Sequence, residues 1–161
     1  FSLIDDHPNL VISRSFSKAH GLAALRLGFC VSNPELSDYL NRVRQPFNAN
    51  SLALDLGKVA LSDQEHISKS VKINSSGMER VKKAFTNLDY NFIESWGNFI
   101  SFDAKQDSDV AFQYFLEKGV ILRSLKVYEM PHHLRVSIGT EEEMDFFLQV
   151  LEDYEKDLSK K

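Results

Sequence analysis

The chain of 161 residues is long enough to bury one hydrophobic core, or one small domain and part of a second. Its composition, 43% hydrophobic and 26% charged, is that of an ordinary globular protein and argues against extensive disorder. Because 19 Lys and Arg stand against 23 Asp and Glu, the net charge of −4 gives no general basic field, and we expect no nucleic-acid partner.

Cys30 is the single cysteine, which excludes an internal disulfide and is typical of a reducing compartment. Its apolar neighbours, Phe29 and Val31, predict a buried and unreactive thiol. No apolar run approaches the roughly 18 residues that a membrane span requires, and no secretion signal opens the chain. These features predict a soluble cytoplasmic protein with no membrane partner. The chain opens on FSLI rather than on Met, and we expect it to be a fragment of a longer protein.

The first predicted strand is NLVIS, residues 9–13, a short apolar run that is typical of a buried strand in a parallel sheet. The segment RSFSKAHG, residues 14–21, would then follow the carboxyl end of this strand, where open α/β sheets usually bind their ligands. A second strand is predicted over residues 26–32.

Three helical patterns follow these strands. Asn33 is placed to cap a helix that starts at Pro34, and Ser51 is placed to cap a second helix. A third helix is predicted from about Asp63 into the 80s, where NSSG at 74–77 weakens its middle and favours a kink or break.

The last part of the chain predicts a compact α+β domain with helices on one face of a sheet. The expected strands are residues 91–95, 98–103, 120–123 and 134–138, and the expected helices are 107–118 and 140–157. Thr140 and Glu143 have the spacing of a capping box. We place the domain boundary inside the long helix, near residues 65–85.

Lys18 is the first candidate for chemistry. Its neighbours in sequence are largely apolar, and a desolvated lysine is a nucleophilic amine suited to a Schiff base with an aldehyde or carbonyl group. Ser15 and Ser17 offer hydroxyl groups, and Arg26, eight residues after the lysine, offers a planar fork for phosphate oxygens. This set meets the needs of pyridoxal 5'-phosphate, PLP. From the spacing alone, a solvated surface lysine is the more common explanation.

The segment NLVISRSFSKAHGLAALRLGF, residues 9–29, resembles the Schiff-base segment of fold-type I PLP enzymes, in particular the histidinol-phosphate aminotransferase branch. The resemblance continues in family order through PFNANSLA, WGNFISF, GVILRSL and MPHHLRVSIGTEEEMDFFLQVLED. It implies an α/β chain with the end of the large PLP-binding domain at 1–70 and the small C-terminal α+β domain at 71–161. It also implies a homodimer and transamination between L-histidinol phosphate and 2-oxoglutarate in histidine biosynthesis.

The resemblance assigns a role to each matching residue of the cofactor segment. Lys18 matches the lysine that forms the Schiff base with PLP and then transfers the proton at the reacting carbon. Ser15, Ser17 and Arg26 match positions that bind the cofactor phosphate. Asn50 lies in a segment that resembles one near the dimer interface and the active site.

Two arginines complete the predicted site. Arg135 matches the small-domain arginine that binds the carboxylate of the amino-acid partner, and Arg123 matches an arginine for the substrate phosphate. From the residues alone, an arginine among Val, Ile and Leu in a strand needs an anionic partner or a route to solvent. An ion pair with one of the chain's own carboxylates explains either arginine about as well.

Other motifs predict structure rather than chemistry. We expect His132 and His133 to lie in a turn, and no Cys or carboxylate has metal-ligand spacing to them, so no metal site is predicted. We expect His20 to have a packing role. Phe146 and Phe147 are expected in the core.

Three features of the family have no counterpart in the sequence: a glycine-flanked phosphate loop, an aromatic ring that stacks on the pyridine, and the aspartate that pairs with the pyridine nitrogen. Asp5 and Asp6 lie too near the lysine strand to replace that aspartate. A glycine of the family, two residues before Arg26, is Ala24 here. The parent enzyme is therefore expected to be an aminotransferase, and this chain alone to be inactive or nearly so.

Two alternatives remain open. One is another activity of the same branch, either an aromatic amino-acid aminotransferase or a phosphothreonine decarboxylase. The other is a non-catalytic chain that acts only through dimerisation or binding.

Overall fold

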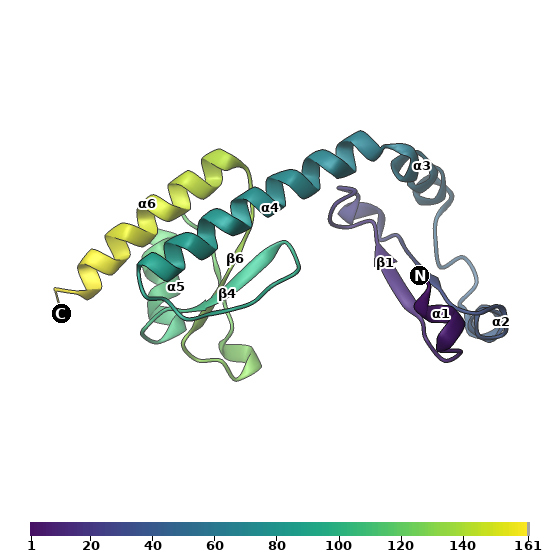
Figure 1. Cartoon of the computed structure of the whole chain (residues 1–161), viewed down its shortest axis with the longest axis horizontal. Coiled ribbons are helices and arrows are strands. Elements are labelled where there is room, and N and C mark those ends of the chain that lie inside the picture. The colour runs from purple at the N-terminus through teal and green to yellow at the C-terminus, as the bar shows by residue number, and fades with distance from the viewer. Residues whose placement is uncertain (161) are drawn as a thin grey trace. The chain divides into compact units, whose positions relative to one another are not determined.

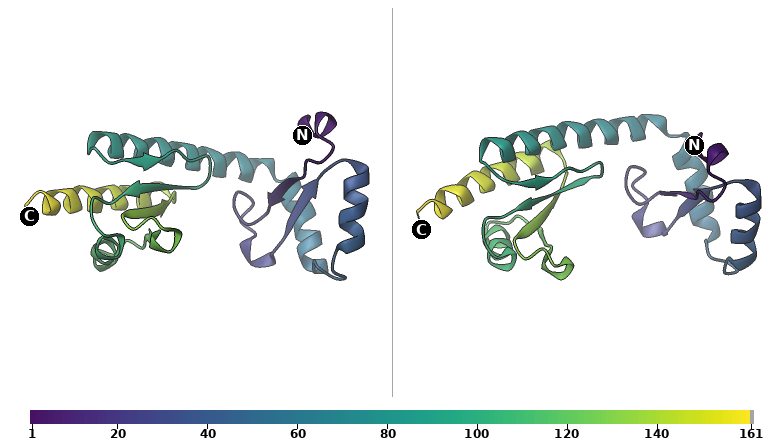
Figure 2. Two further views of the ribbon diagram at one scale, coloured as in Figure 1. Left: turned by 90° about the horizontal axis from the view of Figure 1, so that it is seen from below. Right: turned by 60° about the horizontal axis from the view of Figure 1, so that its bottom comes forward.

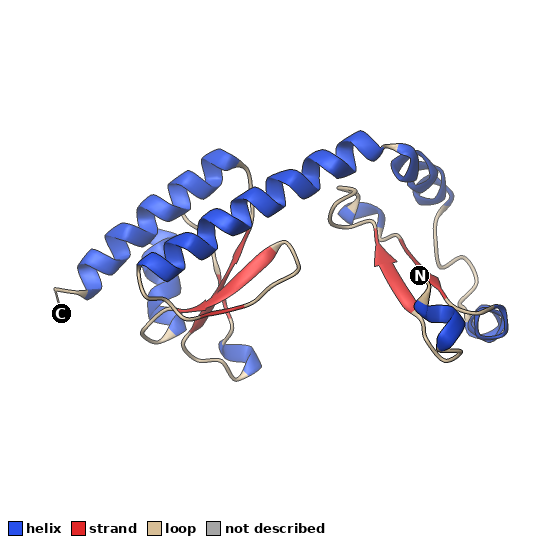
Figure 3. Cartoon of the chain, viewed as in Figure 1, coloured by secondary structure: helices blue, strands red, loops and turns tan. Residues whose placement is uncertain are grey.

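The computed structural model describes residues 1–160 and divides the chain into two compact units, Phe1–Ser70 and the residues from Val71 onward. Helices predominate, and the strands form two separate small sheets (Figure 3). Among the described residues, no helix is long and apolar enough to cross a membrane. Each unit is described by itself below.

The first unit contains an antiparallel strand pair and three helices, followed by the start of a fourth (Figure 1). In chain order its elements are α1 (Leu3–Asp6), β1 (Ile12–Ser15), the 3-10 helix η1 (Ala23–Leu25), β2 (Gly28–Val31), α2 (Pro34–Val43), α3 (Ser51–Ser62) and the start of α4 (Gln64–Asn87). The register pairs Ile12 with Val31 and Ser15 with Gly28.

The expectation of a buried parallel strand is wrong. β1 pairs antiparallel with β2, its neighbour along the chain, because an antiparallel pair needs only a short connection. Both strands are largely exposed, since this sheet has two strands in the described part of the chain. For the same reason Cys30, in β2, is exposed rather than buried as its neighbours had predicted.

A small core lies beneath the connection between the two strands. Phe16, Leu27 and Ala53 are buried together, with Leu22 packed against them. Helix α3 approaches this connection closely at Gly57, where a Cβ atom would lie 2.5 Å from the Cδ2 atom of Leu27. A glycine at this position therefore lets the helix support the segment that follows β1.

The helix starts were predicted well, with one shift. Asn33 caps α2 by accepting a hydrogen bond from the Leu36 amide at 2.8 Å, as expected. Asn50, not Ser51, caps α3, because its Oδ1 atom accepts from the Ala53 amide at 2.8 Å. Asparagine and serine are both strong caps, so adjacent candidates are not separated by propensity.

The break expected at 74–77 is absent, and α4 is continuous from Gln64 to Asn87. The Asn74 amide donates to the carbonyl of Gly97 at 3.1 Å, and Gly77 lies against Ile138, whose Cγ2 atom would be 2.6 Å from a Cβ at that position. These tertiary contacts outweigh the weak helix propensity of the segment.

The second unit is an antiparallel sheet of four strands in the order β3-β4-β6-β5, with helices α4, α5 and α6. Its further elements are β3 (Phe92–Ile93), β4 (Phe99–Asp103), α5 (Ser108–Glu117), β5 (Arg123–Ser124), the 3-10 helix η2 (Lys126–Tyr128), β6 (His133–Ser137) and α6 (Glu141–Leu158). The strand expected over 120–123 is shorter and later, because its pairing with β6 starts only at Arg123.

All three helices cover one face of this sheet, as predicted. The pairs Ile100–Val136 and Phe102–Leu134 are opposite each other in the β4–β6 register and are buried. The helical side chains packed in the same core are Met78, Val81, Phe85, Ala111, Phe115, Met144, Phe147, Val150, Leu151 and Tyr154. Helices α4 and α6 lie side by side and are joined by an ion pair between Arg80 and Asp145 (Figure 2).

The start of α6 confirms the expected capping box. The Glu143 amide donates to Thr140 Oγ1 at 3.3 Å, and the Thr140 amide donates to Glu143 Oε2 at 2.7 Å. Of the two phenylalanines expected in the core, Phe147 is buried, whereas Phe146 is 47% exposed. These neighbours point about 100° apart on a helix, so only one of them faces the sheet.

Candidate active site

Lys18 lies in a tight loop that starts directly after β1. The Leu22 amide donates to the carbonyl of Phe16 at 2.9 Å, which closes the loop. Inside it, the Gly21 amide donates to the carbonyl of Lys18 at 2.8 Å, and Gly21 has a φ of +71°, which glycine adopts without strain. The chain therefore presents Lys18 on a turn whose two ends are fixed by backbone hydrogen bonds.

The Lys18 side chain is exposed, which contradicts the expected apolar environment. The apolar neighbours Phe16, Leu22 and Leu27 point into the small core beneath the loop rather than toward the lysine. In residues 1–160, Lys18 Nζ has neither a carboxylate partner within 4.0 Å nor a hydrogen bond. The amine is thus accessible to a ligand.

In the sequence, Ser17 lies in the same loop, and Ser15 and Arg26 lie close to its two ends. The side chain of each has at least one hydrogen-bond donor without a partner among residues 1–160. Ser15 Oγ accepts from the Ser17 amide at 3.0 Å, so its own hydroxyl proton is available. Arg26 has a φ of 52°, in the left-handed region, and its Nη1 atom donates to the carbonyl of Ala23 at 2.7 Å. Left-handed conformations of residues other than glycine are strained and cluster at functional sites.

This donor set fits the cofactor that the sequence suggested. A primary amine, two hydroxyl groups and a guanidinium group can donate to phosphate oxygens, and within the described residues no carboxylate pairs with the Arg26 side chain. Ala24, which replaces a glycine of the family, lies in η1 with no positive φ, so the substitution causes no backbone strain.

The second unit carries the other two predicted residues. Arg123 in β5 and Arg135 in β6 are directly opposite each other in the strand register, so their side chains leave the same face of the sheet. Like charges placed opposite each other destabilise a sheet. Arg123 is exposed and Arg135 half-buried, so either solvent or a bound anion can stabilise this pair of charges.

Aromatic rings hold both guanidinium groups. The Cζ atom of Arg135 lies 4.7 Å from the centroid of the Phe99 ring, and the Nη2 atom of Arg123 donates to the Tyr128 hydroxyl at 3.1 Å. Neither arginine has a carboxylate within 4.0 Å among residues 1–160. The structure therefore gives no support, in the part of the chain it describes, to internal ion pairs as the reason for these arginines.

Tyr128 and Phe99 are residues that the sequence interpretation missed. Phe99 is an exposed residue of β4 and Tyr128 an exposed residue of η2, and no signal in the sequence separates them from the aromatic residues of the core. His20 has the packing role expected of it, with its ring centroid 4.7 Å from that of Phe16. Asn50 caps a helix, and His133 belongs to β6 rather than to a turn. In the described part of the chain, no group of three His, Cys, Asp or Glu could hold a metal ion.

Comparison with known proteins places the chain in a family. Residues 1–151 match the model of aminotransferase class I and II. The chain belongs to the class I and II aminotransferases. PLP is the cofactor of this family.

Curated relatives of this aminotransferase chain share a more specific name. Histidinol-phosphate aminotransferase 1 of Nitrosococcus oceani is 49% identical over 146 residues, which are 91% of this chain and 40% of the relative. Histidinol-phosphate aminotransferase 2 of Pseudomonas aeruginosa is 50% identical over 145 residues, 90% of this chain and 39% of the relative. The chain thus spans about 40% of the length of these relatives.

Solved structures confirm the fold-type I aminotransferase fold. The histidinol-phosphate aminotransferase of Clostridium acetobutylicum matches with a TM-score of 0.86 and 18% identity, over 97% of this chain and 48% of that one. The enzyme of that name from Sinorhizobium meliloti, in complex with PLP, matches with a TM-score of 0.79 and 24% identity, over 95% of this chain and 43% of that one. The expectation of an α/β chain of this fold type is therefore confirmed.

Proposed function

We propose that this chain is part of a histidinol-phosphate aminotransferase, which transfers an amino group between L-histidinol phosphate and 2-oxoglutarate in histidine biosynthesis. The observation that carries the proposal is the identity of 49% and 50% to curated enzymes of that name across nine tenths of the chain. The free lysine and the opposed arginines support it, because an amine and several anion-binding groups are what such a reaction needs.

In this proposal the first unit holds the cofactor. PLP, when bound, supplies an electron sink that lowers the cost of removing a proton from the substrate carbon. Lys18 would hold the cofactor through its Nζ atom, and the same amine, once released by the incoming substrate amine, would take and return the proton at that carbon. Ser15, Ser17 and Arg26 donate to the cofactor phosphate, and the backbone hydrogen bonds of the loop keep Lys18 at a fixed position relative to them.

The two arginines of the second unit bind the anionic groups of the substrates. Arg135 takes the carboxylate of the amino-acid partner, with one face of its guanidinium covered by Phe99 and its edge left for two parallel hydrogen bonds. Arg123 takes the phosphate of L-histidinol phosphate, a role that a planar fork suits well.

A homodimer in the cytoplasm is part of the proposal. Leu52, Leu56 and Val59 recur on one face of α3 and are 62%, 39% and 65% exposed, which supports an apolar interface there. We also propose that the chain by itself is inactive or nearly so, because the stacking ring and the aspartate that pairs with the pyridine nitrogen have no counterpart in its sequence. Sedimentation of the purified chain tests whether it forms a homodimer, and its transamination rate tests the activity of the chain by itself.

Trapping with borohydride tests the role of Lys18. The chain is mixed with PLP, reduced, and digested for peptide mapping, and we expect the pyridoxyl group on Lys18. Lys58, an exposed lysine of the same unit that bonds to Asp55, serves as the matched control. Label that is absent from Lys18, or equal on Lys18 and Lys58, would contradict the assignment.

Screening of amino donors tests the substrate. The full-length enzyme of which this chain is proposed to be a part is supplied with PLP, 2-oxoglutarate and, in turn, L-histidinol phosphate, phenylalanine and O-phosphothreonine, and glutamate formation and CO2 release are measured. We expect glutamate to form fastest from L-histidinol phosphate. A preference for phenylalanine, or release of CO2 from O-phosphothreonine, would replace the proposed activity by one of the two others in the branch.

A further inference from the structure

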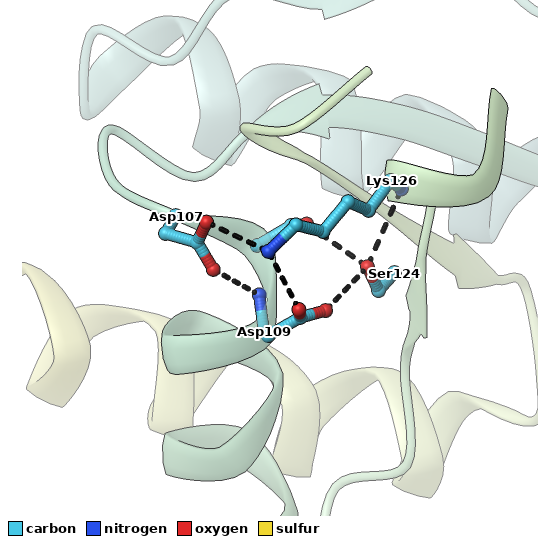
Figure 4. Close-up of polar contacts among 5 residues, drawn as sticks. Asp107, Asp109, Ser124 and Lys126 are labelled. Atoms are coloured by element: carbon cyan, nitrogen blue, oxygen red, sulfur yellow. Dashed lines mark hydrogen bonds and ion pairs between the residues drawn. The ribbon is translucent and has the colours of Figure 1, made fainter. Parts of the chain in front are cut away.

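A polar cluster joins the start of α5 to the segment that carries Arg123 (Figure 4). Lys126 Nζ lies 3.1 Å from Asp107 Oδ2 and 2.8 Å from Asp109 Oδ2. Ser124 Oγ donates to Asp109 Oδ1 at 3.0 Å. We name these four residues, Asp107, Asp109, Ser124 and Lys126, the aspartate–lysine cluster.

The hydroxyl of Ser124 is fully committed in this cluster. Because its single proton goes to Asp109, Ser108 must donate in the 2.9 Å contact between the two serine Oγ atoms. The Lys126 amide also donates to Ser124 Oγ, at 3.4 Å. Ser108 is completely buried, so Ser124 is tied on one side to the core and on the other to the ion pairs.

All three ionisable members of the cluster carry charge at neutral pH. Hydrogen bonds from Lys126 hold the pKa of Asp107 and of Asp109 below the usual range, and the same bonds raise the pKa of Lys126. The contacts that surround Ser124 are therefore charge-assisted and directional.

Buried Leu122 and Leu125 flank β5, and the Leu125 amide donates to the carbonyl of His133 at 3.0 Å, so the backbone is held at both ends. The cluster adds a side-chain restraint on β5 itself, at Ser124. β5 has only two residues, Arg123 and Ser124, and lies at the edge of the sheet. Successive residues of a strand point to opposite faces, so Ser124 points toward α5 while Arg123 points to the face that carries Arg135. Fixing Ser124 thus fixes the direction in which Arg123 leaves the backbone.

The outer end of Arg123 is linked to the same cluster. Its guanidinium donates to the hydroxyl of Tyr128, and Tyr128 is the last residue of η2, the short helix that starts at Lys126. The ion pairs of Lys126 hold the first residue of that helix in place. Both the backbone and the tip of Arg123 are therefore positioned through residues of the aspartate–lysine cluster.

We propose that Ser124 and Lys126 are positioning residues, which act through Arg123 and Tyr128 to set the affinity of the protein for a phosphate group. The proposal rests on the proposed function in taking Arg123 as a phosphate-binding residue. Exposed ion pairs contribute little to stability. If the cluster had a purely structural role, its removal would therefore lower the stability slightly and would not change the affinity for phosphate. The cluster acts instead by keeping the guanidinium aligned for two simultaneous hydrogen bonds.

The test measures phosphate binding at Arg123 directly. The chain is labelled with ¹⁵N-arginine, the Nε–Hε signal of Arg123 is assigned by its loss in Arg123→Lys, and inorganic phosphate is added. Ser124→Ala and Lys126→Met each remove part of the cluster. Lys156→Met is the matched control, because it removes an exposed lysine of the same unit that bonds to Asp153 at 3.0 Å on α6.

We expect both cluster variants to raise the dissociation constant for phosphate about tenfold, which is the scale of one misaligned charge-assisted hydrogen bond. The dissociation constant of the control variant should not change. Backbone amide spectra verify that each variant is folded. Equal dissociation constants in the wild type and in both folded cluster variants would overturn the proposal. An Arg123 signal that does not respond to phosphate in the wild type would overturn both the proposal and the role given to Arg123.

A different result would contradict the proposed function. If phosphate binding depends on the cluster as expected but the donor screen shows no transfer from L-histidinol phosphate, the positioning role stands. The substrate assigned to the site is then wrong.

Discussion

At the scale of single residues, the opposed arginines carry the most information. Arg123 and Arg135 were expected near anions, but only the register shows that they are opposite each other on adjacent strands. Sequence alone left internal ion pairs as an equal explanation, because the partner of a strand residue depends on pairing between distant segments. The exposure of Lys18 was missed for a related reason, since its apolar neighbours point into the core beneath the loop.

Two like charges opposite each other lower the stability of a sheet, and Arg123→Gln should remove this repulsion. We expect this substitution to raise the free energy of unfolding by a few tenths of a kcal/mol, on the order of other cross-strand effects, while it weakens phosphate binding. Urea unfolding followed by circular dichroism gives the stability. Lys83→Gln, at an exposed position in α4, changes the net charge equally and should give no gain. Equal shifts in both variants would show that net charge, not the opposed pair, is responsible.

At the scale of elements, helix ends were predictable and interruptions were not. Asn33, Thr140 and Glu143 act locally through side-chain caps, so a short stretch of sequence is enough to find them. The unbroken α4 depends on contacts of Asn74 and Gly77 with Gly97 and Ile138, which lie more than twenty residues away. The short strand β5 likewise has its limits set by pairing with β6 rather than by its own residues.

The capping box of α6 offers a test of this local energetics. Thr140→Ala removes the acceptor for the Glu143 amide, and we expect the free energy of unfolding to fall by about 1 kcal/mol. Thr86→Ala is the matched control, because Thr86 is exposed near the end of α4 and, among residues 1–160, its hydroxyl bonds only to the carbonyl of Lys82. Urea unfolding measures both variants. A loss of the same size in the control would argue against capping as the cause.

At the scale of the whole molecule, the charged residues of the predicted site have the opposite sign to the net charge of the chain. The chain has a net charge of −4, yet the residues assigned to cofactor and substrates are neutral hydroxyls and cations: Ser15, Ser17, Lys18, Arg26, Arg123 and Arg135. The fold class was accessible from the sequence because the motifs stand in family order, and the roles of these residues stay predictions. The pairing of the strands and the burial of each side chain were not accessible, since both depend on tertiary packing.

The opposed arginines also have a practical consequence for how the protein is handled. A doubled positive charge without a carboxylate partner among residues 1–160 will attract any small divalent anion, sulfate included. A protein of net negative charge gains little long-range steering of an anionic substrate, so added salt should reduce the affinity more than the association rate. If Arg123 and Arg135 bind the substrates as proposed, we expect apparent substrate affinities to depend on the choice of buffer and inorganic phosphate to compete with the substrate.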